Sequence, residues 1–138
     1  SVADAVLNAK LMYCKEQDIP AVISVDKNIR GLTQTELCCV LGNLLDNAIE
    51  AELKLSKAQR KIEIKIVMIE EVLDILIRNR IAEPVLQDVQ KVKNIGTTKQ
   101  DTGNHGFGLK NVREIVKKYD GFMDLHEDSG CFCVHIRI

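Results

Sequence analysis

The chain of 138 residues is long enough to bury a core as a single domain, and its 46% hydrophobic and 28% charged residues are ordinary for a globular protein. A formal net charge of −1 gives no electrostatic reason to expect nucleic acid or an anionic membrane surface as a partner. No apolar run reaches the roughly 18 residues that a membrane span needs, and no signal peptide is visible.

The five cysteines form neither a CxxC metal motif nor an even set for a disulfide framework. Cys38 and Cys39 fall within a predicted helix, and Cys131 and Cys133 alternate along a predicted strand. We therefore expect buried or half-buried free thiols and a cytoplasmic location.

The hydrophobic periodicity predicts helices and strands in a regular order. The predicted elements are a helix at about 3–17, a strand at 21–25, a central helix at 33–52, a polar loop or frayed turn at 53–60, a hairpin at 61–69 and 72–79, a mobile segment at 85–104, a glycine-rich loop at 103–108 opening a helix from 109, and a hairpin at 122–127 and 131–138. Gly121 is expected to end the last helix as a left-handed cap. This order predicts an α/β fold, a two-layer sandwich with one helical layer on a mixed sheet.

Two asparagines distinguish the central helix. Thr33 and Glu36 form a capping box at its start, and Asn43 and Asn47 lie one turn apart on one face of an otherwise apolar pattern. An unpartnered buried amide costs roughly 1–3 kcal/mol. Either both side chains cap neighbouring backbone, or a ligand satisfies them. Counting by two along 72–79 places a third asparagine, Asn79, on the core face of its strand.

The glycines of the 103–108 loop favour a phosphate-binding cradle, because unpaired amides at a helix start point toward an anion. Gly103, Gly106 and Gly108 fit neither the Rossmann nor the P-loop spacing. Thr98 and Lys99 offer a hydroxyl and a cation to the same phosphates, and a solvated loop lysine is an equally good interpretation of position 99. A phosphate chain needs a cation, and the side-chain oxygen of Asn47 is a suitable Mg²⁺ ligand.

The stretches NLLDNAIEA and GNHGFGLKNVREIVKKY resemble the N box and the second glycine box of the GHKL superfamily, which includes gyrase, the large heat-shock chaperone, MutL and histidine kinases. The resemblance covers nearly the whole chain and is greatest to the catalytic domain of sensor histidine kinases, especially the agr-type peptide-receptor and citrate-sensor groups. It implies a Bergerat-type α/β sandwich that binds ATP and Mg²⁺ beneath a lid, here residues 85–104.

The resemblance also implies roles for single residues. Asn47 corresponds to the Mg²⁺ ligand, and Asn43 occupies the catalytic position at which ATP-hydrolysing members carry a glutamate base. Asn79 aligns with the aspartate that recognises adenine. The ATP-binding glycine segment comprises Gly103, His105, Gly106, Phe107, Gly108 and Leu109.

Three departures from the family pattern stand out. The first glycine box lacks its glycines after Asn79, no phenylalanine box is recognisable, and Glu50 stands where many kinases have lysine or arginine. An asparagine at position 79 can still accept a hydrogen bond from adenine.

The three histidines do not look like phosphoacceptors. His126 and His135 fall on the outward phase of their strands and are predicted to face solvent, and His105 lies in the glycine segment. We therefore expect a kinase catalytic domain that binds Mg·ATP for a histidine on a dimerisation helix missing from this chain, and that does not phosphorylate itself. Its expected partners are that dimerisation domain and, indirectly, a response regulator, with a tether to a membrane-embedded sensor.

Two alternatives remain open at this stage. An anti-sigma-factor type serine kinase would keep the fold and act on a partner's serine. A degenerate nucleotide fold would serve as an interaction module, as the altered first glycine box suggests. An ATP-hydrolysing clamp is disfavoured because Asn43 cannot act as a general base.

Overall fold

The computed structural model describes residues 1–83 and 104–138, and the side chains of 104–107 are excluded from the description. The expected lid at 85–104 therefore lies outside the described residues except for its last position. The elements are α1 (Val2–Glu16), β1 (Ala21–Val25), α2 (Gln34–Leu53), the 3₁₀ helix η1 (Lys57–Gln59), β2 (Ile62–Ile69), β3 (Val72–Arg80), α5 (Asn104–Lys118), β4 (Phe122–Asp128) and β5 (Cys131–Arg137).

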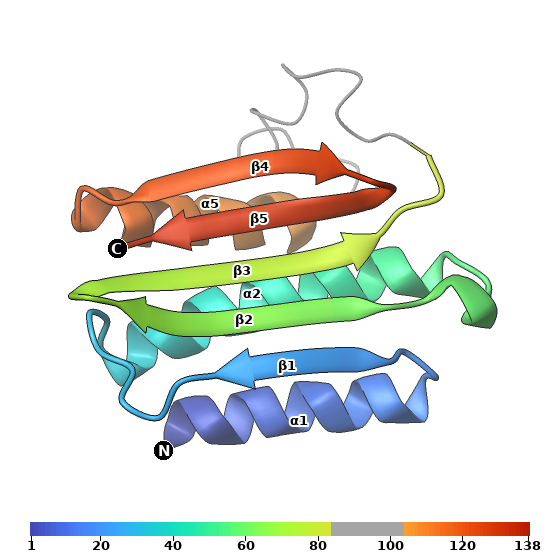
Figure 1. Ribbon diagram of the computed structural model, residues 1–138, viewed down its shortest axis with the longest axis horizontal. Helices are drawn as coiled ribbons and strands as arrows, with labels where there is room; N and C mark the ends of the chain where they lie inside the picture. The colour runs from blue at the N-terminus through green and yellow to red at the C-terminus, as the bar shows by residue number, and fades with distance from the viewer. Residues whose placement is uncertain (84–103) are drawn as a thin grey trace.

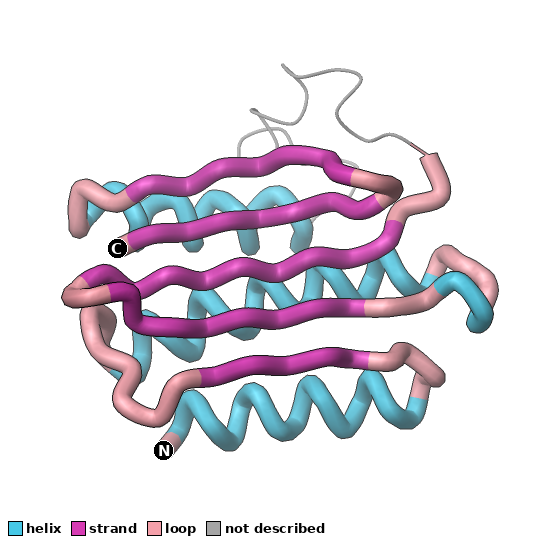
Figure 2. The backbone as a smooth tube through the Cα atoms, viewed as in Figure 1, coloured by secondary structure: helices cyan, strands magenta, loops and turns pink. Residues whose placement is uncertain are grey.

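The five strands form one mixed sheet in the order β1-β2-β3-β5-β4. β1 runs parallel to β2, and the other neighbours are antiparallel. Helices α1, α2 and α5 all lie behind the same face of this sheet, while its other face carries no helix among the described elements (Figures 1 and 2). The predicted two-layer α/β sandwich is confirmed.

The core lies between the helices and the helix-covered face of the sheet. Strand side chains alternate across the sheet, so every second residue of β2 and β3 meets the apolar stripe of α2. The members with no exposed surface are Val40, Leu45, Ile62, Leu73, Ile75, Val112 and Ile136. Burying one such side chain stabilises a fold by roughly 1.5–3 kcal/mol, so this layer holds α2 firmly against the sheet.

The predicted capping box at the start of α2 is present. Thr33 N–H donates to Glu36 Oε1 at 2.9 Å, and Glu36 N–H donates to Thr33 Oγ1 at 3.1 Å. Lys118 Nζ, at 2.7 Å, and the Tyr119 hydroxyl also donate to the Glu36 carboxylate. These two donors and the Thr33 amide lower the pKa of Glu36 to about 2. The last turn of α5 is thereby joined to the first turn of α2.

The end of α5 differs from the prediction at one residue. Asp120, with φ of 53°, takes the left-handed conformation that was expected at Gly121. The Asp120 and Gly121 amides donate to the carbonyls of Lys117 and Val116 at 3.0 and 2.8 Å, which is a Schellman cap. Gly121 is required for a different reason, because a Cβ there would lie 2.6 Å from the carbonyl oxygen of Arg137.

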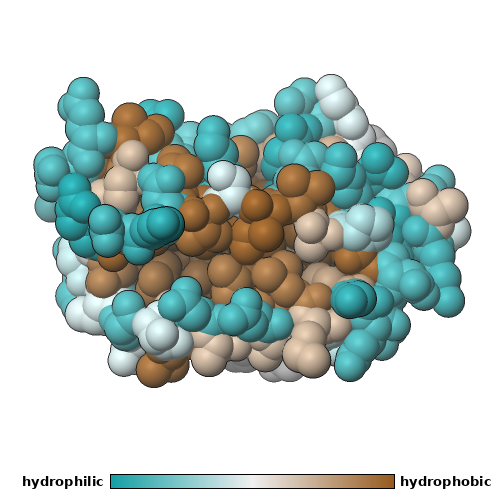
Figure 3. Space-filling view, turned by 60° about the horizontal axis from the view of Figure 1, so that its bottom comes forward, coloured by the Kyte–Doolittle hydropathy of each residue, from teal (hydrophilic) through white to brown (hydrophobic). Residues whose placement is uncertain are grey.

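Strand β1 is an edge strand, and its apolar side chains are only partly covered. Val22 is 57% exposed and Val25 is 40% exposed. Figure 3 shows a band of apolar surface on the side of the molecule where α1 and β1 lie. No helix among the described residues is long and apolar enough to cross a membrane.

All five cysteines are free, as expected from the sequence. Cys14 and Cys133 are 1% and 2% exposed, and burial raises the pKa of both thiols. Cys14 lies on α1 in the core, whereas Cys133 lies on β5.

Candidate nucleotide site

A cavity of about 730 Å³ opens on the helical layer between α1, α2 and α5. Its described lining is Ala9, Lys10 and Tyr13 from α1, Asn43, Asp46, Asn47, Ile49, Glu50 and Leu53 from α2, and Gly108 and Asn111 from α5. The fold thus brings Asn43, Asn47 and Gly108 together, although Gly108 is more than 60 residues away from both asparagines in the chain. This volume is within the usual range for small-molecule sites, about 300–1,000 Å³.

Asn43 is half-buried and lines this cavity. Its side-chain amide donates to Cys39 Sγ, one turn earlier on α2, at 3.3 Å. A Cβ built on Gly108 would lie 3.1 Å from Asn43 Oδ1, so α5 approaches the amide closely because position 108 has no side chain. The hydrogen bond to sulfur differs from the backbone cap that was one expectation for this residue.

Asn47 lies one turn further along α2, half-buried on the same cavity. Its side chain makes no hydrogen bond within the part of the chain that the structure describes, so its amide oxygen is available to a ligand there. The described residues contain no group of three or more His, Cys, Asp or Glu side chains that could hold a metal ion. A Mg²⁺ ion with a single protein ligand and several waters or phosphate oxygens fits this donor set.

The glycine segment is more helical than predicted. Helix α5 begins at Asn104, so Gly106 and Gly108 lie within its first two turns and not in a loop before it. This corrects the predicted loop, since a glycine costs a helix only about 1 kcal/mol relative to alanine. The first four amides of a helix have no intrahelical acceptor, and here they include that of Gly106. They remain suited to bind an anion.

For the other predicted residues of this segment, no side chain that the structure describes lines the cavity. Leu109 is 4% exposed and packs in the core, so only its backbone can face a ligand. His105 and Phe107 are in the first turn of α5, with side chains outside the description. Gly103, Thr98 and Lys99 also lie outside the described residues.

Asn79 is on the core face of β3, as predicted, but it does not line the cavity. It is 5% exposed, and its amide donates to the Arg80 carbonyl at 3.1 Å. The fully buried Glu52 accepts from the Lys61 amide at 2.6 Å, while its Oε2 has no hydrogen-bond partner in the described part of the chain. Burial raises the pKa of Glu52, and the nearby Lys61, Asn79 and Arg80 oppose that rise only in part.

Among the cavity residues that the sequence analysis did not single out, three have charged or amide side chains: Lys10, Asp46 and Asn111. Lys10 Nζ forms an ion pair with Asp46 Oδ1 at 2.6 Å, joining α1 to α2 at the edge of the cavity. No motif marks Lys10, which is one of several polar residues around a predicted amphipathic helix. Only the packing of α1 against α2 shows its position.

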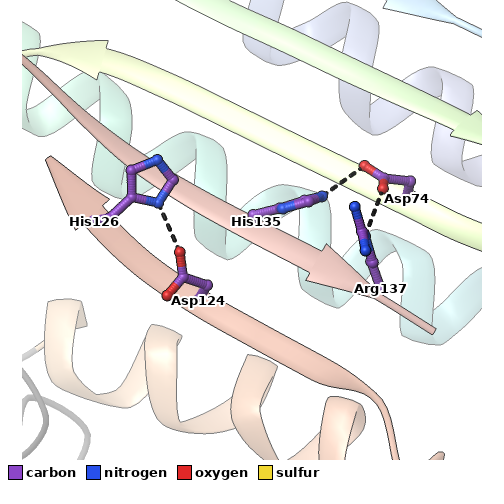
Figure 4. A network of polar contacts seen from close by, with 5 residues as sticks. All are labelled: Asp74, Asp124, His126, His135 and Arg137. Atoms are coloured by element: carbon purple, nitrogen blue, oxygen red, sulfur yellow. Dashed lines mark hydrogen bonds and ion pairs between the residues drawn. The ribbon is translucent and has the colours of Figure 1, made fainter. Parts of the chain in front are cut away.

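The two strand histidines lie on the open face of the sheet, away from the cavity (Figure 4). His126 is 44% exposed and pairs with Asp124 at 2.7 Å. His135, 22% exposed, bonds through Nε2 to Asp74 at 2.9 Å, and Arg137 Nε bonds to the other Asp74 oxygen at 3.1 Å. Both point outward as predicted, but His135 is part of a polar network.

Comparison with known proteins identifies the family of this chain and agrees with its fold. Residues 32–138 match the family model described as the GHKL domain. The chain is 29% identical to the sensor histidine kinase DpiB of Escherichia coli over 73% of its own length and 19% of the relative's. It is 27% identical to a probable C4-dicarboxylate sensor kinase of Bacillus subtilis over 93% and 25% of the two lengths. The chain thus spans a quarter or less of these relatives.

Solved structures show the same fold. The nucleotide-free catalytic domain of histidine kinase ThkA superposes with a TM-score of 0.79 at 20% identity, covering 99% of this chain and 90% of that one. The mycobacterial sensor histidine kinase MprB gives a TM-score of 0.73 at 17% identity, covering 98% and 92%. With most of its length matched by one family model, the chain belongs to the GHKL domain family, and its relatives include sensor histidine kinases.

Proposed function

We propose that this domain binds Mg·ATP in the cavity between α1, α2 and α5 and presents the γ-phosphate to a histidine elsewhere in a sensor kinase. The observation that carries the proposal is the meeting of Asn43, Asn47 and Gly108 on one cavity of about 730 Å³. These residues come from the two stretches that resemble the N box and the second glycine box.

Each of the three has a distinct part in this proposal. Asn47 offers its amide oxygen to Mg²⁺, because that oxygen has no other partner among the described residues. Gly108 has no side chain, so the start of α5 can come close to the phosphates. The unpaired backbone amides in the first turn of α5 then bind the phosphates. Bound Mg·ATP supplies the phosphoryl group and the countercharge, so the protein's task is positioning and electrostatic stabilisation.

Asn43 favours phosphotransfer over hydrolysis. A carboxamide cannot accept a proton from water as a glutamate does, and the side chain is oriented by Cys39 Sγ. The domain would therefore hold ATP without consuming it quickly until an acceptor arrives. Helix α1 contains no histidine, so the acceptor would belong to a dimerisation helix outside the described elements.

Calorimetric titration of the purified chain with ATP tests this function, with and without Mg²⁺ and with GTP as a control. We expect ATP-selective binding that Mg²⁺ strengthens. Absence of binding at millimolar ATP, in a chain that circular dichroism shows to be folded, would overturn the proposal and favour an interaction module. Phosphorylation of a serine on a partner protein would instead favour the serine-kinase alternative.

A further inference from the structure

Lys10 lines the same cavity as Asn43 and Asn47, although it comes from a different helix. Its ammonium pairs with Asp46 Oδ1 at 2.6 Å. Asp46 immediately precedes Asn47 and lies one turn after Asn43. The ion pair therefore sits beside the two asparagines that define the proposed phosphate and metal site.

A polyphosphate ligand in this cavity would lie near charged side chains of both signs. Among its described lining residues, Asp46 and Glu50 are anionic and Lys10 is the only cation. A carboxylate such as Asp46 would repel a triphosphate, so a protein cation close by would stabilise the bound ligand.

We propose that Lys10 is a cation that binds the ATP phosphates in this domain, and that it exchanges its Asp46 partner for phosphate oxygens when nucleotide binds. This assignment rests on the proposed function and places a positive charge from α1 beside Asn43 and Asn47 of α2. A lysine ammonium binds phosphate as a point charge and sits on a flexible stem of four carbons, so it can change partners without movement of the helix.

Helix α1 is anchored well enough to hold this charge in place. Its Ser1–Asp4 capping box fixes the start, and Leu7 and Cys14 are buried on either side of Lys10 along the helix. The Lys10 side chain is 30% exposed and that of Asp46 is 53% exposed. Asp46 can therefore return to water at little cost once the ammonium leaves it, since exposed ion pairs contribute little to stability.

The test compares Lys10→Met with Lys15→Met, each titrated calorimetrically with ATP, inorganic tripolyphosphate and adenosine. Lys15 is an exposed lysine on the same helix that borders a separate groove beside Asp18 and Ile19. We expect Lys10→Met to weaken ATP and tripolyphosphate binding about tenfold and to leave adenosine binding unchanged. Lys15→Met should match the wild type with all three ligands.

Two further variants separate a phosphate contact from a structural role. Lys10→Arg should restore much of the lost ATP affinity, and Asp46→Asn should tighten ATP binding several-fold by removing the competing carboxylate. A Lys10→Met chain that binds ATP as tightly as a binding-competent wild type would overturn this assignment alone. A wild-type chain that binds no ATP would overturn the proposed function as well.

Discussion

The molecule places polar side chains in two regions that differ in how completely they are paired. On the open face of the sheet, both oxygens of the 6%-exposed Asp74 are bonded, one to His135 and one to Arg137 (Figure 4). On the helical layer, the half-buried Asn47 has no hydrogen bond with the described residues. A polar network in which every hydrogen-bonding group has a partner stabilises the fold, whereas a side-chain amide at a cavity without a hydrogen-bond partner is suited to bind a ligand. The two regions should respond to mutation in opposite ways.

The largest expected effect is on binding at Asn47. Asn47→Ala removes the proposed metal ligand, so we expect Mg·ATP affinity to fall about 100-fold while the free energy of unfolding is unchanged or slightly raised by the helix propensity of alanine. Calorimetry and urea unfolding measure the two quantities. Asn8→Ala, an exposed asparagine of α1 outside the cavity, is the matched control. Equal affinities of the two variants would remove Asn47 from the site.

Asp74→Ala should show the converse behaviour. It leaves His135 and Arg137 without their shared acceptor, and we expect a loss of about 1–3 kcal/mol in the free energy of unfolding with ATP affinity unchanged. Asp124→Ala, which breaks the exposed pair with His126, should cost no more than about 1 kcal/mol. Similar losses in the two urea titrations would show that burial of Asp74 adds nothing.

Gly108→Ala tests whether the close approach of α5 to Asn43 is needed for ATP binding. The added methyl would lie 3.1 Å from Asn43 Oδ1 and crowd the start of α5, so we expect ATP affinity to fall about threefold to tenfold. Gly42→Ala on α2 is the control because a Cβ there meets nothing within 4 Å. It should stabilise the helix by up to about 1 kcal/mol and leave binding unchanged. Weakened binding in both variants would indicate a general effect of helix stiffening.

The smallest effects should appear as opposite pH dependences at the two ends of α2. Lys118, Tyr119 and Thr33 lower the pKa of Glu36 to about 2. The contribution of Glu36 to the stability of the fold is therefore complete above the ordinary carboxyl pKa of 4.5, and it is lost as the pH falls from 4.5 toward 2. Burial raises the pKa of Glu52. The contribution of the protonated Glu52 to the stability of the fold is therefore complete below pH 4.5, and it is lost as the pH rises through the pKa of Glu52 in the folded protein.

Glu36→Gln and Glu52→Gln test these signs by thermal unfolding across acid and neutral pH. Glu36→Gln should flatten the loss of stability in acid, because a glutamine keeps the capping box but cannot be protonated. Glu52→Gln should gain stability relative to the wild type as pH rises. Parallel pH profiles for wild type and Glu52→Gln would show that this carboxyl does not titrate differently on folding.

The sequence predicted most of the fold because its signals are local. The capping box of Thr33 and Glu36 and the alternation of 61–69 and 72–79 depend on nearby residues, and both were found within one residue of their expected bounds. Gly121 was assigned the wrong role because its neighbour, a strand carbonyl of Arg137, is distant in sequence. A left-handed aspartate at position 120 then completes the cap.

The site was predictable only in part, for the same reason. Asn43 and Asn47 carry a local signal, an amide pair within an apolar helix, and the structure places both on one cavity. Lys10 carries none, since its position depends on how α1 packs against α2. Asn79 was placed on the correct face of β3, but its distance from the cavity depends on the whole sheet.

The two buried thiols, Cys14 and Cys133, can report on opening of the folded structure without any introduced label site. Cys14 and Cys133 are almost inaccessible and their raised pKa values suppress the thiolate, so an alkylating reagent reacts with them only when the surrounding structure opens. One reports on the helical layer and the other on the sheet. Mass-spectrometric mapping of the label at Cys14 and at Cys133 over time, with and without ATP, would therefore distinguish local release of α1 from global unfolding.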